Sequence, residues 1–239
     1  MGVRGFGDGS MARFRYAGRV LFGSLIEIRD ETPRSAPLNM ALDEVLLRGV
    51  RAPLLRCYRW DVAAVSFGYF GKHAAVSQAW PGHAIVRRMT GGGIVPHGQD
   101  LTYSLIVPAG HPFATHSPRA VYRAIHEAIG ALLTGRGEVA ALACAPAGAG
   151  TGVCFESPAE FDLLAHGSKI AGAAMRRTSD GLLLQGSIQR LPGLETLRPR
   201  LAGAFATHVI AGGYTPAQSA DAESLAAEKY AAPAWTMRV

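Results

Sequence analysis

The stretch from Ile85 to His97 contains the residue types best suited to holding a ligand. It includes Arg87, Arg88, Thr90 and three consecutive glycines, Gly91, Gly92 and Gly93. Glycine loses more backbone freedom on folding than other residues, so this run indicates that something approaches the backbone closely. We expect a backbone-lined groove whose amide N–H groups, with Arg87 or Arg88, hold an anionic or carbonyl-bearing ligand. The structural alternative is a glycine-rich bulge between two strands.

Two common phosphate-binding motifs do not fit this glycine run. A P-loop ends in Gly-Lys-Ser or Gly-Lys-Thr before a helix, whereas Ile94-Val95-Pro96-His97 follows here. The run also lacks the Gly-x-Gly-x-x-Gly pattern that opens a helix in dinucleotide-binding domains. His97 is a candidate general base, a donor to a ligand or a surface residue, and no second histidine stands at metal-ligand spacing. We therefore predict no metal site.

Cys154 is the second candidate for chemistry. A lone cysteine is commonly a buried hydrophobic residue, which we expect for Cys57, and Cys144 lies in an alanine-rich stretch without companions. Cys154 differs because a lysine, Lys169, lies downstream of it in another predicted strand. If strands 152–155 and 169–176 lie close together, the ammonium lowers the pKa of the thiol and gives a thiolate that can accept an acyl group.

Asp162, near the start of a predicted strand, is a candidate partner for a basic side chain. We expect it to pair with Arg176 or Arg177 in a structural ion pair.

Two helices are predicted to flank these segments. The first spans Ser35 to Val50, with Ser35 as the cap and apolar residues at helical spacing. Asp43 and Glu44 lie off the apolar stripe and are expected to face solvent, although Asn39 and Asp43 could support a nearby site. The second helix spans Ser117 to Leu133, with Gly135 as its end.

The remaining pattern predicts short strands. They are Leu54–Trp60, Ala64–Phe70, His83–Met89, Ile94–Val95, Leu101–Val107, Gly152–Phe155, Phe161–Leu164, Lys169–Arg176 and Leu182–Ile188. Ala140 to Gly152 is predicted to be a flexible loop, and Ala165 to Ser168 a hairpin turn. A last helix is expected over Ser219 to Tyr230. This order predicts an α+β (mixed α/β) domain with a mostly antiparallel sheet flanked by helices.

Length and composition limit the class of protein. The chain has 239 residues, 49% hydrophobic and 18% charged, which fits a globular domain. The net charge of +6 favours acidic partners, but the basic residues are scattered, so we do not expect nucleic-acid binding. No apolar run reaches the ~20 residues of a membrane span. Three cysteines and no signal-peptide pattern predict a cytoplasmic protein with reduced thiols.

Three blocks together resemble a known family. They are Asn39-Met40-Ala41-Leu42-Asp43-Glu44, then Arg87 to Gly93 with His97 and Leu101-Thr102-Tyr103-Ser104, and finally Cys154-Phe155-Glu156-Ser157-Pro158 through Lys169-Ile170-Ala171-Gly172 to Gln185-Gly186-Ser187-Ile188. Their order and spacing are similar to the biotin/lipoate protein ligase and octanoyltransferase superfamily. The resemblance implies a catalytic domain over residues 21–215, after a flexible leader at 1–20 and before a helical tail at 216–239.

The resemblance is closest to the cysteine-dependent octanoyltransferases. It implies that Cys154 carries the acyl group and that Lys169 lies beside the thiol. It also implies an acyl-binding segment, formed by Arg87, Arg88, Thr90, Gly91, Gly92, Gly93 and His97 together with Gly172 and Ala173. An octanoyl or lipoyl group would move from acyl carrier protein to a lysine of a lipoyl-domain protein, such as the glycine cleavage H protein or a dehydrogenase E2 subunit. No cofactor is then required.

Two other functions remain open at this point. An ATP-dependent lipoate–protein ligase would use ATP and Mg and form a lipoyl-adenylate. The stand-alone ligases generally have an additional C-terminal domain, which we do not expect here. A protein of another class would bind acyl or lipoyl carriers without catalysis.

Overall fold

The large sheet is the central element of the computed structural model, which describes residues 20–138, 140–144 and 158–238. Its strands are β1 (Phe22–Arg29), β2 (Leu54–Tyr58), β6 (Leu101–Pro108), β7 (Ala140–Leu142), β8 (Leu163–Ala165), β9 (Ser168–Arg177), β10 (Gly181–Ile188) and β11 (Ala206–Ala211). They are arranged in the order β11-β1-β2-β6-β10-β9-β8-β7. β1 is parallel to β11 and β2, and the other neighbours are antiparallel. The predicted mixed, mostly antiparallel class is confirmed.

A smaller sheet holds the glycine run. It consists of β3 (Ala64–Phe67), β4 (Ala84–Arg87) and β5 (Val95–His97) in the order β4-β3-β5. β3 is parallel to β4 and antiparallel to β5. The three glycines lie in the connection between β4 and β5, so the backbone of this connection is anchored at both ends by β3.

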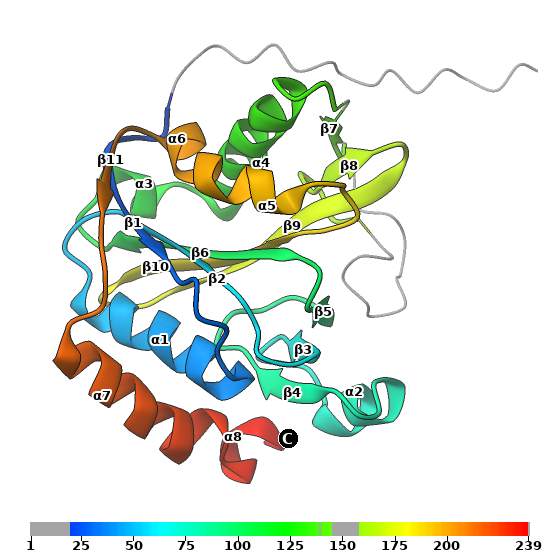
Figure 1. The fold of residues 1–239 in the computed structure, drawn as a ribbon, viewed down its shortest axis with the longest axis vertical. Helices are drawn as coiled ribbons and strands as arrows, with labels where there is room; N and C mark the ends of the chain where they lie inside the picture. Colours follow the sequence, from blue (N-terminus) through cyan, green and yellow to red (C-terminus); the bar gives the residue numbers. More distant parts are fainter. Residues whose placement is uncertain (1–19, 139, 145–157, 239) are drawn as a thin grey trace, which may run out of the picture.

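Helices cover both faces of the large sheet (Figure 1). They are α1 (Ala36–Gly49), α2 (His73–Ala79), α3 (Pro112–Thr115), α4 (Pro118–Thr134), α5 (Leu194–Leu197), α6 (Leu201–Phe205), α7 (Pro216–Leu225) and α8 (Pro233–Thr236), with a 3-10 turn η1 (Arg198–Arg200) and a π-helical turn η2 (Ala226–Tyr230). α4, α5 and α6 lie on one side of the large sheet, and α1 lies on the other side with α7 packed outside it. The small sheet lies at the α1 side.

The predicted helix starts are confirmed by their caps. The side chain of Ser35 accepts a hydrogen bond from the backbone of Leu38 at the start of α1, and Ser117 caps α4 in the same way. The last helix begins a little earlier than predicted. Thr215 and Gln218 form a reciprocal capping box, which fixes the start of α7 at Pro216.

The expectation that Asp43 and Glu44 face solvent was wrong. Asp43 is fully buried and Glu44 is 7% exposed, because α1 is covered on one side by the sheet and on the other by the C-terminal helices. Glu44 accepts hydrogen bonds from Lys229 Nζ and from the Tyr230 hydroxyl, both at 2.6 Å. A helix packed between two layers can bury charged residues where other side chains form ion pairs or hydrogen bonds with them.

Several strands differ from the predicted pattern. Residues 140–142, predicted to begin a flexible loop, form β7 and pair with β8. The sequence analysis assigned no element to β1 or β11, which pair with each other in parallel. The predicted strand 152–155 lies outside the described residues.

The predicted hairpin at Ala165 to Ser168 is confirmed. Ala165 pairs with Ser168, and His166 and Gly167 both have positive φ angles, 49° and 76°. Two successive left-handed residues are the backbone of a type I′ turn, whose twist matches the flanking strands β8 and β9.

Candidate functional site

An apolar pocket lies between α1, the small sheet and strands β9 and β10, and we call it the inner pocket. It has about 410 Å³ of empty space, a volume that includes space open to solvent. Its walls carry few charges and many small residues. They are formed by Met40, Tyr58, Trp60, Ser66, Arg88, Val95, His97, Thr102, Gly172, Ala173, Ala174, Gln185, Gly186 and Ser187. The pocket therefore offers a small apolar space with one guanidinium and one imidazole at its wall.

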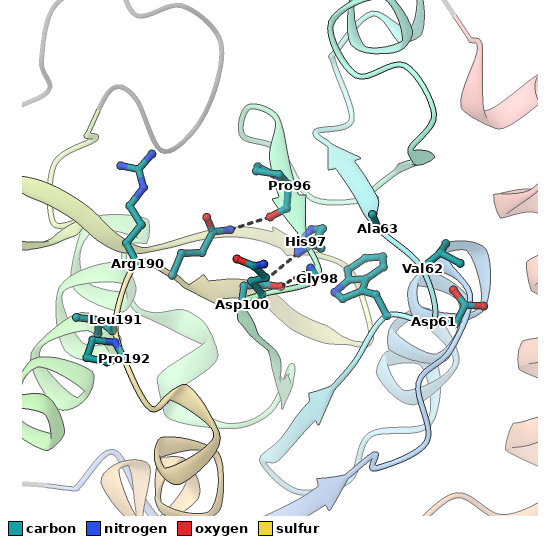
Figure 2. A pocket seen from close by; sticks show the side chains of 13 residues that line it. Asp61, Val62, Ala63, Pro96, His97, Gly98, Asp100, Arg190, Leu191 and Pro192 are labelled. Carbon is teal, nitrogen blue, oxygen red and sulfur yellow. Dashed lines mark hydrogen bonds and ion pairs between the residues drawn. The ribbon is translucent and has the colours of Figure 1, made fainter.

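A wider depression opens beside the inner pocket, and we call it the outer hollow (Figure 2). It encloses about 1470 Å³, a volume that includes space open to solvent. Its rim is formed by Asp61, Val62, Gln99 and the segment from Gln189 to Pro192. Trp60 and His97 line both spaces. These two rings therefore stand at the boundary between an apolar pocket and a solvent-open surface.

Arg88 organises the glycine run and lines the inner pocket. Its Nη2 donates to the carbonyl oxygens of Gly91 and Gly93, both at 3.0 Å, and its Nη1 donates to Ser66 Oγ at 2.7 Å. Gly92 has a φ of 85° and lies against β9, where a Cβ atom would be 3.3 Å from that of Ala174. The glycine run is therefore a loop that folds around the guanidinium of Arg88. Thr90 and the three glycines lie behind the residues that line the pocket.

Arg87, although adjacent, is directed elsewhere. Its five N–H groups donate to the carbonyl oxygens of Tyr69, Gly71, Trp235, Thr236 and Arg238. It is not among the lining residues of either space. Successive residues of a strand point to opposite faces, so only one of two adjacent arginines can face the pocket. In this structure Arg87 joins the C-terminal segment to the turn after β3, and its predicted contact with substrate stays a prediction.

His97 forms a buried chain of polar contacts. Its Nδ1 is 2.9 Å from Asp100 Oδ2 and its Nε2 is 2.6 Å from Ser66 Oγ. Its ring stacks on that of Trp60 with the centroids 4.1 Å apart. Asp100 Oδ2 also accepts from the hydroxyls of Thr102 and Ser187, both at 2.7 Å.

The carboxylate of Asp100 is stabilised in its charged form. Burial alone would raise the pKa of Asp100, but the nearby His97 and the hydrogen bonds from His97, Ser187 and Thr102 lower it below its usual value. Asp100 is therefore ionised at neutral pH and accepts a hydrogen bond from the Nδ1–H of His97. The other ring nitrogen, Nε2, then faces Ser66.

Lys169 forms a second buried polar pair near the inner pocket. Its Nζ is 2.7 Å from Asp162 Oδ2, and the two side chains are 2% and 6% exposed. The expectation that Asp162 pairs with Arg176 or Arg177 was wrong. Arg176 donates to the carbonyl of Met89 and Arg177 to that of Ala114 instead, because both lie farther along β9.

The turn before Asp162 is held by a histidine of α4. His126 Nδ1 is 2.6 Å from the carbonyl oxygen of Phe161, which itself has a φ of 68°. Burial lowers the pKa of His126, so the neutral ring donates its Nδ1–H to this carbonyl. The backbone N–H of Ala159 donates to Asp162 Oδ2 at 2.6 Å. These contacts fix the carboxylate that holds Lys169.

An irregularity in β9 explains the spacing between Lys169 and Gly172. Lys169 pairs with Leu164, but Ala171 pairs with Leu163, so β9 contains one additional residue at Ile170. Ile170 and Ala171 both pack in the core on the α4 side. A bulge of this kind shifts the alternation, so that Lys169 and Gly172 share a face.

Gly172 leaves the space that the lysine occupies. A Cβ atom on Gly172 would lie 2.5 Å from Lys169 Cε and 2.7 Å from its Nζ. Ser187, opposite Gly172 in β10, directs its hydroxyl to Asp100. Opposite residues of an antiparallel pair project to the same face, so the ammonium lies on the face of the sheet that carries the inner pocket.

The predicted site residues are therefore brought together in part. Arg88, His97, Gly172 and Ala173 line the inner pocket, and Lys169 lies over Gly172. Cys154 lies outside the described residues. The described residues that flank this segment are hydrogen-bonded to each other, because the backbone N–H of Ala143 donates to the carbonyl oxygen of Asp162 at 2.8 Å.

Comparison with known proteins assigns this arrangement to a family. The model of the lipoyl protein ligase A/B catalytic domain matches residues 35–203. The chain belongs to this family. All three sequence blocks lie within the matched region, and the predicted resemblance is confirmed.

Individual proteins of the family share the sequence and the fold. Octanoyltransferase LipM of Oceanobacillus iheyensis is 38% identical over 177 residues, which cover 70% of this chain and 65% of that protein. Protein Ta0514 of T. acidophilum, assigned as a lipoate protein ligase, superposes with a TM-score of 0.70 at 24% identity, covering 91% of this chain and all of that one. A bi-partite lipoate protein ligase from Thermoplasma acidophilum, studied with its E2 lipoyl domain, gives 0.57 at 22%, covering 91% and 96%. These two structures establish the fold.

The chain covers only part of its curated relatives. The matched region spans 60 to 65% of the length of the first four LipM proteins.

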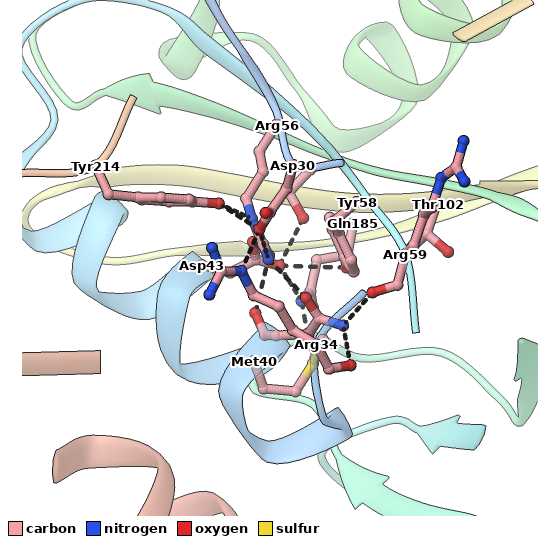
Figure 3. A network of polar contacts seen from close by, with 12 residues as sticks. Asp30, Arg34, Met40, Asp43, Arg56, Tyr58, Arg59, Thr102, Gln185 and Tyr214 are labelled. Carbon is pink, nitrogen blue, oxygen red and sulfur yellow. Dashed lines mark hydrogen bonds and ion pairs between the residues drawn. The ribbon is translucent and has the colours of Figure 1, made fainter. Parts of the chain in front are cut away.

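A buried polar network adjoins the inner pocket at Gln185 (Figure 3). Gln185 accepts from Thr90 Oγ1 at 2.7 Å and donates to Asp43 Oδ2 at 2.8 Å. The other oxygen of Asp43 accepts from Arg56 Nη1 at 2.9 Å. Arg56 is fully buried and also contacts Asp30 Oδ2 at 3.2 Å. The network fixes the orientation of the Gln185 amide at the pocket wall and connects it to α1, as expected for Asp43 in support of a site.

Several residues of this site were not predicted from the sequence. Ser66 and Asp100 complete the contacts of His97, Gln185 lines the inner pocket, and Arg56 supports Gln185 through Asp43. Asp100 stands three residues after His97, a spacing that could have been noted. Ser66 lies in a different strand, and no local pattern distinguishes it from other serines.

Within the described part of the chain, no group of three or more His, Cys, Asp or Glu side chains could hold a metal ion. None of the described helices is both long and apolar enough to cross a bilayer.

Proposed function

We propose that this protein is an acyltransferase of lipoate biosynthesis. It moves an octanoyl group, or a lipoyl group, from acyl carrier protein to a lysine of a lipoyl-domain protein. The similarity to octanoyltransferases named LipM supports this activity. The structural observation that carries the proposal is the apolar inner pocket with the buried ammonium of Lys169 on the same face of the sheet.

The inner pocket supports a medium-length acyl chain as the transferred group. Its small residues from Gly172 to Ala174 leave space beside the backbone of β9, and Met40 and Val95 add apolar surface. Each CH₂ group removed from water contributes about 0.8 kcal/mol, so an apolar chain gains more here than a charged metabolite of similar size.

We assign Cys154 as the residue that holds the acyl group as a thioester. The thiolate attacks the incoming thioester carbonyl, and the carrier thiol leaves. Lys169 is assigned to stabilise the thiolate, because an ammonium nearby favours the charged form of a thiol. The segment that carries Cys154 continues into Pro158–Asp162, beside Lys169, which supports this assignment.

The proposed partners follow from the chemistry and from the charge of the chain. Acyl carrier proteins are acidic, and a net charge of +6 favours association with an acidic partner. The related bi-partite ligase was studied with an E2 lipoyl domain. We therefore propose lipoyl domains of the glycine cleavage H protein or of dehydrogenase E2 subunits as acceptors.

Intact-mass analysis tests the proposal. The protein is mixed with octanoyl-acyl carrier protein without ATP, and the acyl-enzyme mass is recorded before and after a lipoyl domain is added. We expect an octanoyl adduct on the wild type, none on Cys154→Ser, and an unchanged adduct on Cys144→Ser, whose exposed thiol is a matched control. Transfer that requires ATP and free lipoate would replace this function with that of an adenylating ligase, and an active Cys154→Ser protein would remove the thioester on Cys154.

A further inference from the structure

The proposed transfer requires a proton acceptor that the roles of Cys154 and Lys169 do not supply. The lysine of the acceptor domain has a pKa of about 10.4 in water, so it arrives as an ammonium and must lose protons to form an amide. Lys169 is itself an ammonium in an ion pair with Asp162 at 2.7 Å. A separate group near the acyl chain must therefore take the proton.

The contacts of Ser66 and His97 have the geometry of a proton relay. Ser66 Oγ accepts a hydrogen bond from Arg88 Nη1 at 2.7 Å, so its own hydrogen is directed to His97 Nε2, 2.6 Å away. His97 Nδ1 then donates to Asp100 at 2.9 Å. This is the order of groups in which an imidazole withdraws a hydroxyl proton and a carboxylate stabilises the resulting imidazolium.

The relay lies where the two substrates would meet. Ser66 and His97 line the inner pocket, and His97 also borders the outer hollow, which is open to solvent (Figure 2). An acyl group in the pocket and an amine that enters from the hollow would meet next to this pair. Trp60 holds the plane of the imidazole by stacking at 4.1 Å.

We propose that Ser66, His97 and Asp100 form the proton relay for amide formation, an inference that rests on the proposed function. The acceptor ammonium first loses one proton to water in the outer hollow. The nitrogen of the neutral amine then bonds to the acyl carbon while a second proton passes to Ser66 Oγ, and the hydroxyl proton of Ser66 passes to His97 Nε2. The C–S bond breaks with its electron pair on the sulfur of the enzyme thiolate. The proton on His97 leaves to solvent through the outer hollow. Ser66 contacts the substrate, and His97 and Asp100 act through it.

Charged groups on all sides of His97 affect the relay. Asp100 contacts its Nδ1 directly, and Arg88 reaches its Nε2 through Ser66. Asp61 and Arg190 line the outer hollow with it. The transfer step therefore depends on pH through several groups, and the test compares each variant with the wild type at the same pH.

The test measures loading and transfer separately on the full chain. Once loaded with octanoyl from the carrier, His97→Gln should pass it to a lipoyl domain about 100-fold more slowly than the loaded wild type does. Ser66→Ala should show a smaller loss in the same step. His208→Gln, on the exposed strand β11, is the matched control and should change neither step. The loss in His97→Gln should shrink between about pH 7 and about pH 9.5, because hydroxide then removes the amine proton.

Each outcome decides between the two proposals. If the wild type takes no octanoyl group, the proposed function and the relay both fall. If it loads and His97→Gln transfers at the wild-type rate, or with a loss that is equal at both pH values, only the relay falls. Failure of both His97→Gln and Ser66→Ala to load, or an octanoyl ester on Ser66 in a Cys154→Ala protein, would also overturn the relay.

Discussion

Two buried pairs of a base and a carboxylate flank the inner pocket, and they differ in what they can do. On the side of the small sheet, His97 meets Asp100 at 2.9 Å, and along β9 Lys169 meets Asp162 at 2.7 Å. All four side chains are nearly inaccessible to water. An imidazole beside a carboxylate can accept a proton, whereas an ammonium beside a carboxylate is already charged. The His97 pair is therefore suited to proton transfer, and the Lys169 pair to supplying a fixed positive charge.

The largest expected effect breaks the Lys169 pair. Lys169→Met leaves the buried Asp162 without this ammonium, and we expect a loss of about 3–5 kcal/mol in the free energy of unfolding. Lys229→Met is the matched control, because Lys229 forms an ion pair with Glu44 at 2.6 Å but is 26% exposed. We expect it to cost about 1 kcal/mol or less. Urea denaturation measures both, and equal losses would show that Asp162 does not depend on Lys169.

A smaller effect is expected when the lysine is displaced but not removed. Gly172→Ala would place a Cβ atom 2.5 Å from Lys169 Cε, so the side chain must move. We expect a cost of about 1–3 kcal/mol and slower octanoyl loading, while His97 and Asp100 are untouched. Gly23→Ala, in β1, has no atom within 4 Å of the added Cβ and should change neither stability nor loading. Normal loading by Gly172→Ala would separate the ammonium from the chemistry.

The smallest effect at neutral pH concerns the other carboxylate. Asp100→Asn keeps an oxygen that accepts hydrogen bonds from Thr102 and Ser187, so we expect a loss of about 1 kcal/mol at pH 7. The folded pKa of Asp100 is lowered, so its contribution is fully present above the unfolded value of about 3.9 and is lost as pH falls through the lower folded pKa.

The acid side of the stability curve measures this contribution. Asp100→Asn should lose less stability than the wild type between about pH 5 and about pH 2. Asp180→Asn, at an exposed turn, is the control and should follow the wild-type curve. Parallel curves for Asp100→Asn and the wild type would contradict an ionised, stabilised Asp100.

Local sequence patterns predicted the parts of the fold that local interactions determine. The serine caps of α1 and α4 and the two-residue turn at His166-Gly167 are fixed by neighbours in sequence, and all are confirmed. β1 and the edge strand β11 were missed, because their pairing joins residues that are far apart in the chain. Asp43 was misplaced because its partners come from strands β2, β6 and β10, and Glu44 because its partners come from the C-terminal segment.

The site could be predicted only as far as its motifs extend. The motifs pointed to Arg88, His97 and Gly172, which meet at the inner pocket, and to Lys169 over Gly172. They did not distinguish Arg87 from Arg88, because strand alternation separates two neighbours that look alike in the sequence. The pairing of Lys169 with Asp162 depends on a bulge in β9 that no residue type in the sequence predicts. The proximity of Cys154 to Lys169 stays a prediction.

The extra residue at Ile170 has a consequence for protein engineering and for natural variation. The face of the sheet on which the Lys169 ammonium lies depends on the number of residues in β9 opposite β8, and not only on the presence of a lysine. In a strand without this bulge, a lysine three residues before the glycine would point to the opposite layer, although every residue named in the motif would survive. A homologue could therefore keep an intact signature and still lack a correctly directed charge.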